Sequence, residues 1–579
     1  MLAAMLALLL GAALAQPAAA APALPVAAVA EAYVERYFDT YPSQATAAGR
    51  HDLDVRLEDL SPERLAAWVA FNRETAARLR ALLAGPSPAL DDRLDAELLL
   101  AQAEREVHEL AVRRRPERDP LWWTGLAGNV TVFLLVRDDL PEGERLERAA
   151  ERATHLPRLA MQARLALAGT DLAEIAPEHC RLAAGQARAN AAFYREGFAS
   201  LAAGRAAPLA RRLRVAATAA SLALDAWAVS LDGLAARATG SPRLGDDYAA
   251  TFRLGTGVET PVDELLREAE AALRAKRAEA AAYGREVWAR LLPGEAPPAD
   301  DAALLARLFA RAAEDRAESV EEFVADYRDL VAKAEAFARE HAIVTLPDPL
   351  TLHIDRSPAF FLGQSVGGVY PAGPYQPEAK TLFFLPAPPA SATPAERDAF
   401  FRDFNHHFNV MITPHEMVPG HYLQLKWAAR HPRKVRALFP DGVYVEGWGT
   451  FCERLLLDLG WGGPLDRLAH LKKQLENIAR TVVDVRVHTR GMTRDEVLAY
   501  VRGEALQDEQ FAANMWTRAI TSSPQIATYF LGYREVQGLY DDVRRDRGPA
   551  FRLREFMDGM MELGPVPVRH YRVRLLPAP

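Results

Sequence analysis

His415, Glu416 and His421 bring two potential metal ligands and a potential general base within seven residues. In the H-E-x-x-H motif of zinc hydrolases the two histidines share one face of a helix, and the glutamate activates water. Here Pro419 occupies the place of the second histidine. His421 follows two residues later, about 120° away from His415 on a regular helix. Pro419 and Gly420 would allow the chain to loop out and turn His421 back toward His415.

The same segment also fits the start of a helix. Thr413 would be the N-cap, Pro414 the first helical residue and Glu416 the acid that closes a capping box. In that interpretation Glu416 satisfies backbone N–H groups and His415 is a surface residue. The segment alone leaves both interpretations open.

A zinc site needs a third protein ligand and an open position for water. Glu446 follows His421 by 25 residues, which is enough chain to turn and return antiparallel. Glu453 lies seven residues further, on nearly the same helical face, where it could orient a ligating histidine. The alternatives are a buried, hydrogen-bonded structural acid at Glu446 and an ordinary ion pair with arginine at Glu453.

A segment near the C-terminus carries donors that could stabilise an oxyanion during peptide hydrolysis. Tyr529 and Tyr533 are four residues apart, so one helical face could present both, and Arg518 precedes them. Tyrosines beside a glycine also occur where helices simply pack closely. Further upstream His488 could bind substrate, although a solvated helical residue is the alternative.

Most of the chain shows the periodicity of amphipathic helices, which predicts a mainly α fold. From residue 27 to about 337 the apolar residues recur with helical spacing, and a proline-rich loop lies at 293–301. The clearest helical stretches of this part are 62–83, 93–109, 146–168 and 208–238. After the strands described next, a capping box at Thr393 opens a helix to about Ile412. Further helices are expected at 421–430, 443–459, 465–488, 494–518 and 523–545.

Two strand-like runs interrupt the helices just before the histidine motif. They span 350–354 and 381–385, and a stretch rich in glycine and proline separates them. We expect a small sheet here whose edge strand could bind a substrate backbone by strand addition. A hairpin that caps the helices is the alternative.

The composition is that of a soluble globular protein. The 579 residues are 50% hydrophobic and 25% charged, and the net charge of −8 does not indicate a nucleic-acid partner. Cys180 and Cys452 are the only cysteines, and we expect both to be buried and unpaired rather than bonded to each other.

Residues 1–22 have the pattern of a secretory signal. An apolar run ends in small residues, and the A-x-A cleavage pattern fits 13–15. About 13 apolar residues are short for a membrane span, and no cysteine follows the run as in a lipoprotein. The sequence therefore predicts an exported protein, periplasmic or secreted, without stable membrane insertion.

Taken together, these segments resemble the bacterial "domain of unknown function 885" family of predicted zinc metallopeptidases. The resemblance lies in H-E-x-x-P-G-H at 415–421, E-G-W at 446–448, the segment 524–532 and an N-terminal signature at 41–49. It implies a large multi-helix zincin-like fold with a deep central cleft and a small sheet near the active site. Angiotensin-converting-enzyme and thimet-oligopeptidase relatives place a glutamate ligand and oxyanion-binding tyrosines similarly, which favours Glu446, Tyr529 and Tyr533.

The chain departs from the family at Tyr422, where many members carry a second consecutive histidine after the glycine. We favour His421 as the ligand because it is the histidine that remains in the motif. The expected organisation is a single domain over 23–579, with a helical part at about 27–340 and a sheet-containing catalytic part at about 341–579.

The resulting hypothesis is a zinc-dependent peptidase that acts on short peptides. Glu416 would move the proton of the attacking water, and Tyr529, Arg518 and Tyr533 would assist. The Zn²⁺ ligands would be His415, His421 and Glu446, with Glu453 behind them. Two rivals remain, namely a non-catalytic peptide-binding protein and a metal-dependent hydrolase of another amide or ester.

Overall fold

The computed structural model describes residues 25–85, 88–347, 350–358, 368–389 and 391–576. The predicted signal segment lies outside these residues. Helices make up most of the described chain, and one small sheet accompanies them, which confirms the predicted mainly α class.

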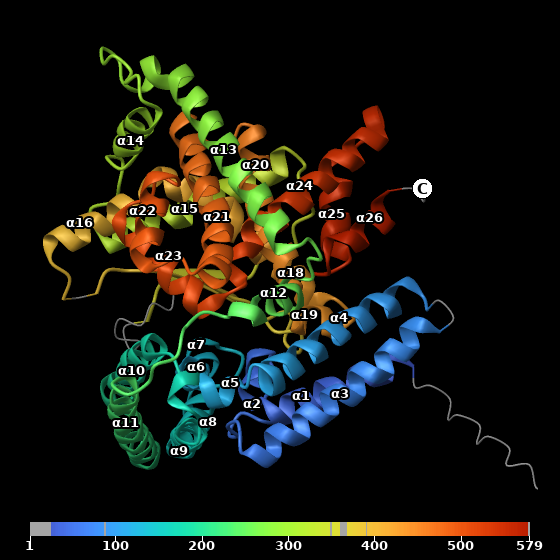
Figure 1. The fold of residues 1–579 in the computed structure, drawn as a ribbon, viewed down its shortest axis with the longest axis vertical. Coiled ribbons are helices and arrows are strands. Elements are labelled where there is room, and N and C mark those ends of the chain that lie inside the picture. The colour runs from blue at the N-terminus through green and yellow to red at the C-terminus, as the bar shows by residue number, and fades with distance from the viewer. Residues whose placement is uncertain (1–24, 86–87, 348–349, 359–367, 390, 577–579) are drawn as a thin grey trace, which may run out of the picture.

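The N-terminal helices form one side of the molecule (Figure 1). Several begin with proline in the first turn, a position where the missing N–H has no helical partner. The predicted helix at 146–168 is two helices, because the chain turns at residues 154 and 155. The helices of this part are α1 (Val26–Thr40), α2 (Pro42–Ala47), α3 (Pro62–Ala84), α4 (Leu90–Val107), α5 (Arg115–Arg118), α6 (Pro120–Asn129), α7 (Val132–Val136), α8 (Glu142–Ala153), α9 (Leu156–Ala168), α10 (Pro177–Ala192) and α11 (Ala207–Ala235).

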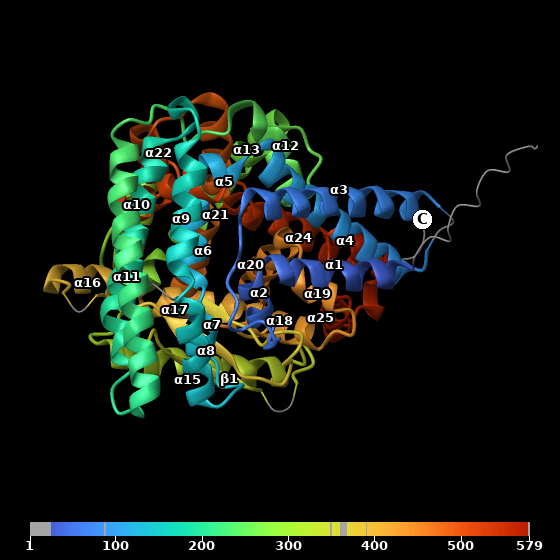
Figure 2. The same cartoon turned by 90° about the horizontal axis from the view of Figure 1, so that it is seen from below.

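One helix of the described chain, α11, is long and apolar enough to cross a membrane by length and composition. Its most apolar window is 44% buried within the protein. It packs along α10 and also contacts α8 and α9, and Figure 2 shows it beside α9 and α10. One face of α11 is thus packed, and Val215, Leu222 and Val229 are exposed on the other.

The helices that follow α11 form most of the other side of the molecule (Figure 1). Helices before the sheet pack with those after it, as α13 does along α21 and α15 against α17. The helices are α12 (Tyr248–Thr256), α13 (Val262–Leu291), α14 (Asp301–Ala312), α15 (Val320–Glu340), α16 (Pro394–Asp403), α17 (His406–Glu416), α18 (His421–Arg430), α19 (Lys434–Leu438), α20 (Gly442–Asp458), α21 (Pro464–Arg490), α22 (Arg494–Gly503), α23 (Glu509–Ser522), α24 (Thr528–Arg547), α25 (Leu553–Glu562) and α26 (Val568–Leu575).

The sheet has three strands in the order β1-β3-β2. They are β1 (Leu352–Arg356), β2 (Gly368–Tyr370) and β3 (Thr381–Leu385). The central strand β3 is parallel to β1 and antiparallel to β2, and all five of its residues are buried. The Tyr327 ring of α15 stacks on Phe383 of β3 with 5.2 Å between centroids. Both predicted strands are present, and substrate binding at an edge of the sheet stays a prediction.

Two predicted boundaries near the histidine motif are wrong. The capping box at Thr393 is present, but its helix ends at Asp403, and Asn405 caps a new helix, α17. Thr413 does not begin a helix, because it lies near the end of α17 and its hydroxyl donates to the carbonyl of Asn409, 2.7 Å away. Glu416 is the last residue of α17, so the capping-box interpretation of this glutamate is also wrong.

The structure also tests the expectations for the cysteines and for the helix at 494–518. Cys180 and Cys452 are both free and buried, as predicted. The predicted helix at 494–518 is divided between α22 and α23, because the chain leaves the helix after Gly503 and Asp508 caps the next one.

Candidate metal centre

A short linker, residues 417–420, joins the two helices that carry the histidines. The Val418–Pro419 peptide bond is cis, and α18 begins directly after Gly420. A side chain at Gly420 would collide with the carbonyl oxygen of His415, so the chain can turn this tightly only with glycine. The indole nitrogen of Trp448 donates to the carbonyl of Pro419 at 2.9 Å and holds the linker against α20.

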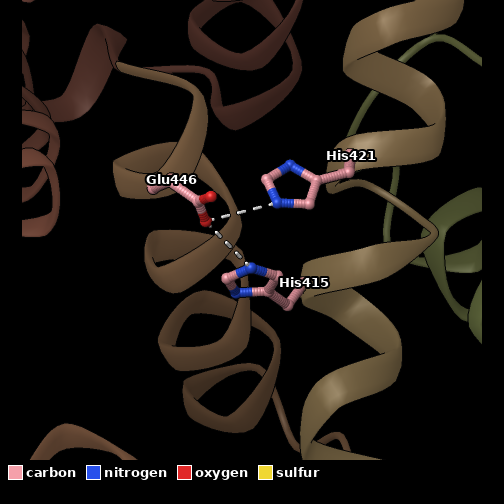
Figure 3. Close-up of side chains that lie close together, drawn as sticks. All are labelled: His415, His421 and Glu446. Atoms are coloured by element: carbon pink, nitrogen blue, oxygen red, sulfur yellow. Dashed lines mark ion pairs between the residues drawn. The ribbon is translucent and has the colours of Figure 1, made fainter. Parts of the chain in front are cut away.

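This linker brings the two imidazole rings together. Their centroids are 4.6 Å apart, and Figure 3 shows His421 returning toward His415. The loop expected at Pro419 and Gly420 is therefore present, in the form of a helix end and a new helix start rather than a bulge within one helix.

Glu446 completes a cluster of three donor groups. Its Oε2 lies 3.7 Å from Nε2 of His415 and 3.6 Å from Nε2 of His421 (Figure 3). Tetrahedral zinc with bonds of about 2.0–2.1 Å places its ligand atoms about 3.4 Å apart. The donor types and spacing therefore fit a zinc ion held by these three side chains.

The E-G-W-G sequence of α20 has a separate task at each position. Gly447 packs on Gly532 of α24, where a side chain on either residue would collide with the other helix. Gly449 faces the His415 ring, whose atoms would lie 2.8–2.9 Å from an added Cβ. With Glu446 in the cluster and Trp448 on the linker, these residues fix how α20 meets both histidine helices.

Glu453 connects the cluster to a third histidine. One of its oxygens lies 2.7 Å from Nδ1 of His415, and the other lies 2.9 Å from Nδ1 of His470 on α21. Because a carboxylate accepts, His415 donates its Nδ1–H to Glu453, and its Nε2 faces Glu446. Metal-binding histidines commonly have this arrangement.

The charges of the cluster are strongly coupled. Burial lowers the pKa of His415, but the carboxylates of Glu446 and Glu453 outweigh this and hold that pKa well above its ordinary value. Burial likewise raises the pKa of Glu446, and the two histidines outweigh it and hold it well below the usual range. A cation bound here would replace the proton charge that these carboxylates attract.

Gln525 links the cluster to the C-terminal segment. Its amide nitrogen donates to Oε1 of Glu446 at 3.1 Å and to the hydroxyl of Tyr529 at 3.4 Å. Its amide oxygen accepts from Arg518 at 2.6 Å. Tyr529 and Arg518 thus both lie beside the three-residue cluster, although they come from different helices.

Arg480 of α21 also lies beside Tyr529 and Arg518. Its guanidinium carbon lies 4.5 Å from the centroid of the Tyr529 ring, and that of Arg518 lies 5.8 Å away. Arg480 pairs with Glu476 at 2.5 Å, and Lys473 pairs with the same glutamate at 3.0 Å.

Tyr533 takes a different direction from Tyr529. Burial raises its pKa to about 12, and the charged groups acting on it include Arg454, Glu279 and Asp458. Among the described residues, no hydrogen bond or ion pair joins Tyr533 to the three-residue cluster. The carboxylate of Glu453, which holds His415, also acts on the pKa of Tyr533, so Tyr533 lies behind the cluster rather than in contact with it.

Two residues considered in the sequence are core residues instead. His488 is only 3% exposed, so the expectation of a solvated side chain is wrong, and both of its ring nitrogens bond to backbone groups. Tyr422 is fully buried among apolar side chains, so its position faces the core and not the cluster.

Three residues of the site have no role in the sequence interpretation, namely His470, Arg480 and Gln525. His470 and Arg480 lie on a helix that was predicted, but no spacing in that helix points to the histidine motif. Gln525 belongs to the segment that resembles the family, so its polar side chain beside a proline was an available signal.

Comparison with known proteins supports the fold. The family model described as "Bacterial protein of unknown function (DUF885)" matches residues 42–575. No curated protein matches the chain. A solved structure described as "a putative lipoprotein of unknown function from Shewanella oneidensis" superposes with a TM-score of 0.78 at 22% identity, covering 96% of this chain and all of that one. A structure described as "the putative lipoprotein from Colwellia psychrerythraea" has a TM-score of 0.76 at 14% identity, covering 95% of this chain and 98% of its own. The chain therefore belongs to the DUF885 family of bacterial proteins.

Proposed function

We propose that this protein is a zinc-dependent metallopeptidase that hydrolyses short peptides within a zincin-like fold. The orientation of His415 is the observation that carries the proposal. Its Nδ1 is committed to Glu453, and its Nε2 faces a point shared with His421 and Glu446. A buried ring held in this way is suited to bind a metal through Nε2. The deep central cleft expected from the family stays a prediction.

A zinc ion in this cluster would supply a Lewis acid and a water of lowered pKa. Glu416 follows His415 at the end of α17, is half-buried, and acts on the pKa of that histidine through its charge. We assign to Glu416 the transfer of a proton from the attacking water to the leaving amine. We assign to the hydroxyl of Tyr529 the donation of a hydrogen bond to the developing oxyanion, because Gln525 connects this hydroxyl to Glu446.

Replacement of Glu416 by glutamine tests the proposal. The variant keeps its size and leaves the three donor groups untouched, so we expect stoichiometric zinc by metal analysis. Peptide hydrolysis should fall by about 10²–10⁴-fold, the usual contribution of a general base. A peptide library and a panel of other amides and esters, digested by wild type and variant, would identify the bond class. Unchanged hydrolysis in the variant contradicts the assignment.

The outcome also separates the rival functions. A peptide-binding protein without catalysis should keep its peptide affinity in the variant and show no hydrolysis in the wild type. A hydrolase of another amide or ester should cleave the panel but not the library.

We further propose that the protein works outside the cytoplasm. Residues 1–22 have the pattern of a secretory signal, and both similar structures are described with the word lipoprotein.

A further inference from the structure

Arg518 is a cation beside the candidate metal centre that hydrogen-bonds a neutral amide rather than a carboxylate. It is half-buried on α23, and among the described residues it makes no ion pair. Its Nη2 donates to the neutral amide oxygen of Gln525, whose nitrogen donates in turn to Glu446. One side-chain amide therefore separates this guanidinium from a residue of the cluster.

The surroundings of Arg518 have a surplus of positive charge. Arg480 and Lys473 share a single acid, Glu476, which is 4% exposed. Arg480 and Arg518 both lie over the ring of Tyr529. Three basic side chains thus face two acids on this flank, Glu476 and Glu446, and the charge of Glu446 would be taken up by a bound metal ion.

We infer that Arg518, supported by Arg480, binds the C-terminal carboxylate of the substrate, so that the enzyme removes residues from the C-terminus of peptides. The inference rests on the proposed peptidase function. A guanidinium presents a planar fork of donors that matches a carboxylate, and the hydrogen bonds are stronger than those to a neutral amide. A substrate carboxylate would therefore compete well with the amide oxygen of Gln525 for the N–H donors of Arg518.

The charge balance disfavours the opposite polarity. An aminopeptidase must accept an ammonium group near the scissile bond, and this flank would repel it. Arg518 could instead stabilise the oxyanion, but that role would aid cleavage of every peptide to the same extent. The two roles therefore differ in whether the free carboxylate matters.

The test compares N-acetyl-pentaalanine with its C-terminal amide. The zinc-loaded wild type should cleave the acid with a kcat/KM about 10–100-fold above that of the amide, as expected for a hydrogen-bonded charge. Arg518→Ala should lower the value for the acid by the same factor and change that for the amide little. Arg518→Lys should recover part of the loss. Arg534→Ala on α24, which removes an arginine paired with Glu268 of α13, is the control and should behave as wild type.

Binding measurements keep this test separate from catalysis. By calorimetry, zinc-loaded Glu416→Gln should bind the acid more tightly than the amide, and adding Arg518→Ala should abolish the difference. Equal loss for both peptides in Arg518→Ala, or equal treatment of both by the wild type, overturns the carboxylate site. If no peptide is cleaved but the binding difference is present, the peptidase proposal fails and the carboxylate site stands.

Discussion

Two buried clusters of histidine and carboxylate lie along α21. Near its start, His470 shares Glu453 with His415, and near its end His488 lies 3.8 Å from Asp484. Both clusters are almost inaccessible to solvent. They differ in what remains unused on the histidines.

At His488 both ring nitrogens are occupied by the backbone. The N–H of Leu244 donates to Nδ1 at 3.0 Å, and Nε2 donates to the carbonyl of Ala519 at 2.9 Å. At His415 one nitrogen donates to Glu453, and the other faces Glu446 and His421. A histidine near a carboxylate therefore becomes a candidate ligand only when its second nitrogen is left for a ligand.

The charge states differ in the same sense. Burial raises the pKa of Asp484 to about 7, despite hydrogen bonds from Tyr248 and Ser523, and burial lowers the pKa of His488 to about 4. Near neutral pH this pair is closer to neutral, whereas the carboxylates at His415 stabilise positive charge. Positive charge is what a metal ion would supply.

The removal of one histidine from each cluster should produce the largest difference between the two clusters. His421→Ala is expected to lose stoichiometric zinc, because only two of the three donor groups remain. His488→Ala should keep its zinc and lose stability instead, since two buried backbone groups lose their partners. Metal analysis and thermal unfolding of both variants measure the two effects. Zinc retained by His421→Ala would refute the ligand assignment.

Glu453→Gln should have a smaller effect on the same centre. The amide can still accept from His415, but it no longer carries the charge that strengthens this bond. We expect zinc affinity to fall by about 10–100-fold, as is usual when the partner of a metal-binding histidine is replaced. Competition with a chelator measures the affinity, and Asp484→Asn is the matched control, for which no change is expected.

Asp484→Asn should show the smallest effect, and only as a dependence on pH. Between pH 4 and 7 the folded wild type holds a proton at Asp484 that the unfolded chain has lost, so this group stabilises the fold less as pH rises. Asparagine stays neutral, so the variant should gain on wild type by about 1.4 kcal/mol per pH unit in this range. The lowered pKa of His488 makes stability rise with pH instead, but this contribution is the same in wild type and variant and cancels in their difference. Urea unfolding at pH 5 and 7 measures the difference, and a constant difference would argue against the raised pKa.

The sequence predicted the helical class and the chemistry that local spacing can carry. His415, Glu416 and His421 are neighbours in the chain, and the role of proline and glycine between them follows from backbone preferences. Glu446 could be predicted as a ligand because the 25 residues after His421 allow a second helix to return antiparallel beside the histidines. The helix boundaries at Asp403 and Gly503 were missed because the caps Asn405 and Asp508 stand inside otherwise continuous helical patterns.

The residues contributed by α21 were beyond the sequence for a different reason. His470 and Arg480 reach the centre through the packing of α21 against α17, α20 and α24. Their positions depend on how whole helices cross, which no spacing within one segment records. Polar residues on such a helix are therefore assigned only when the neighbouring helices are in place.

The contact between Gly449 and the ring of His415 has an evolutionary consequence. A single methyl group at this position would displace the imidazole without altering any donor atom. A relative that keeps both histidines and both glutamates but has alanine here would be expected to hold His415 in another orientation. The donor residues alone would then not tell whether such a relative can bind a metal ion.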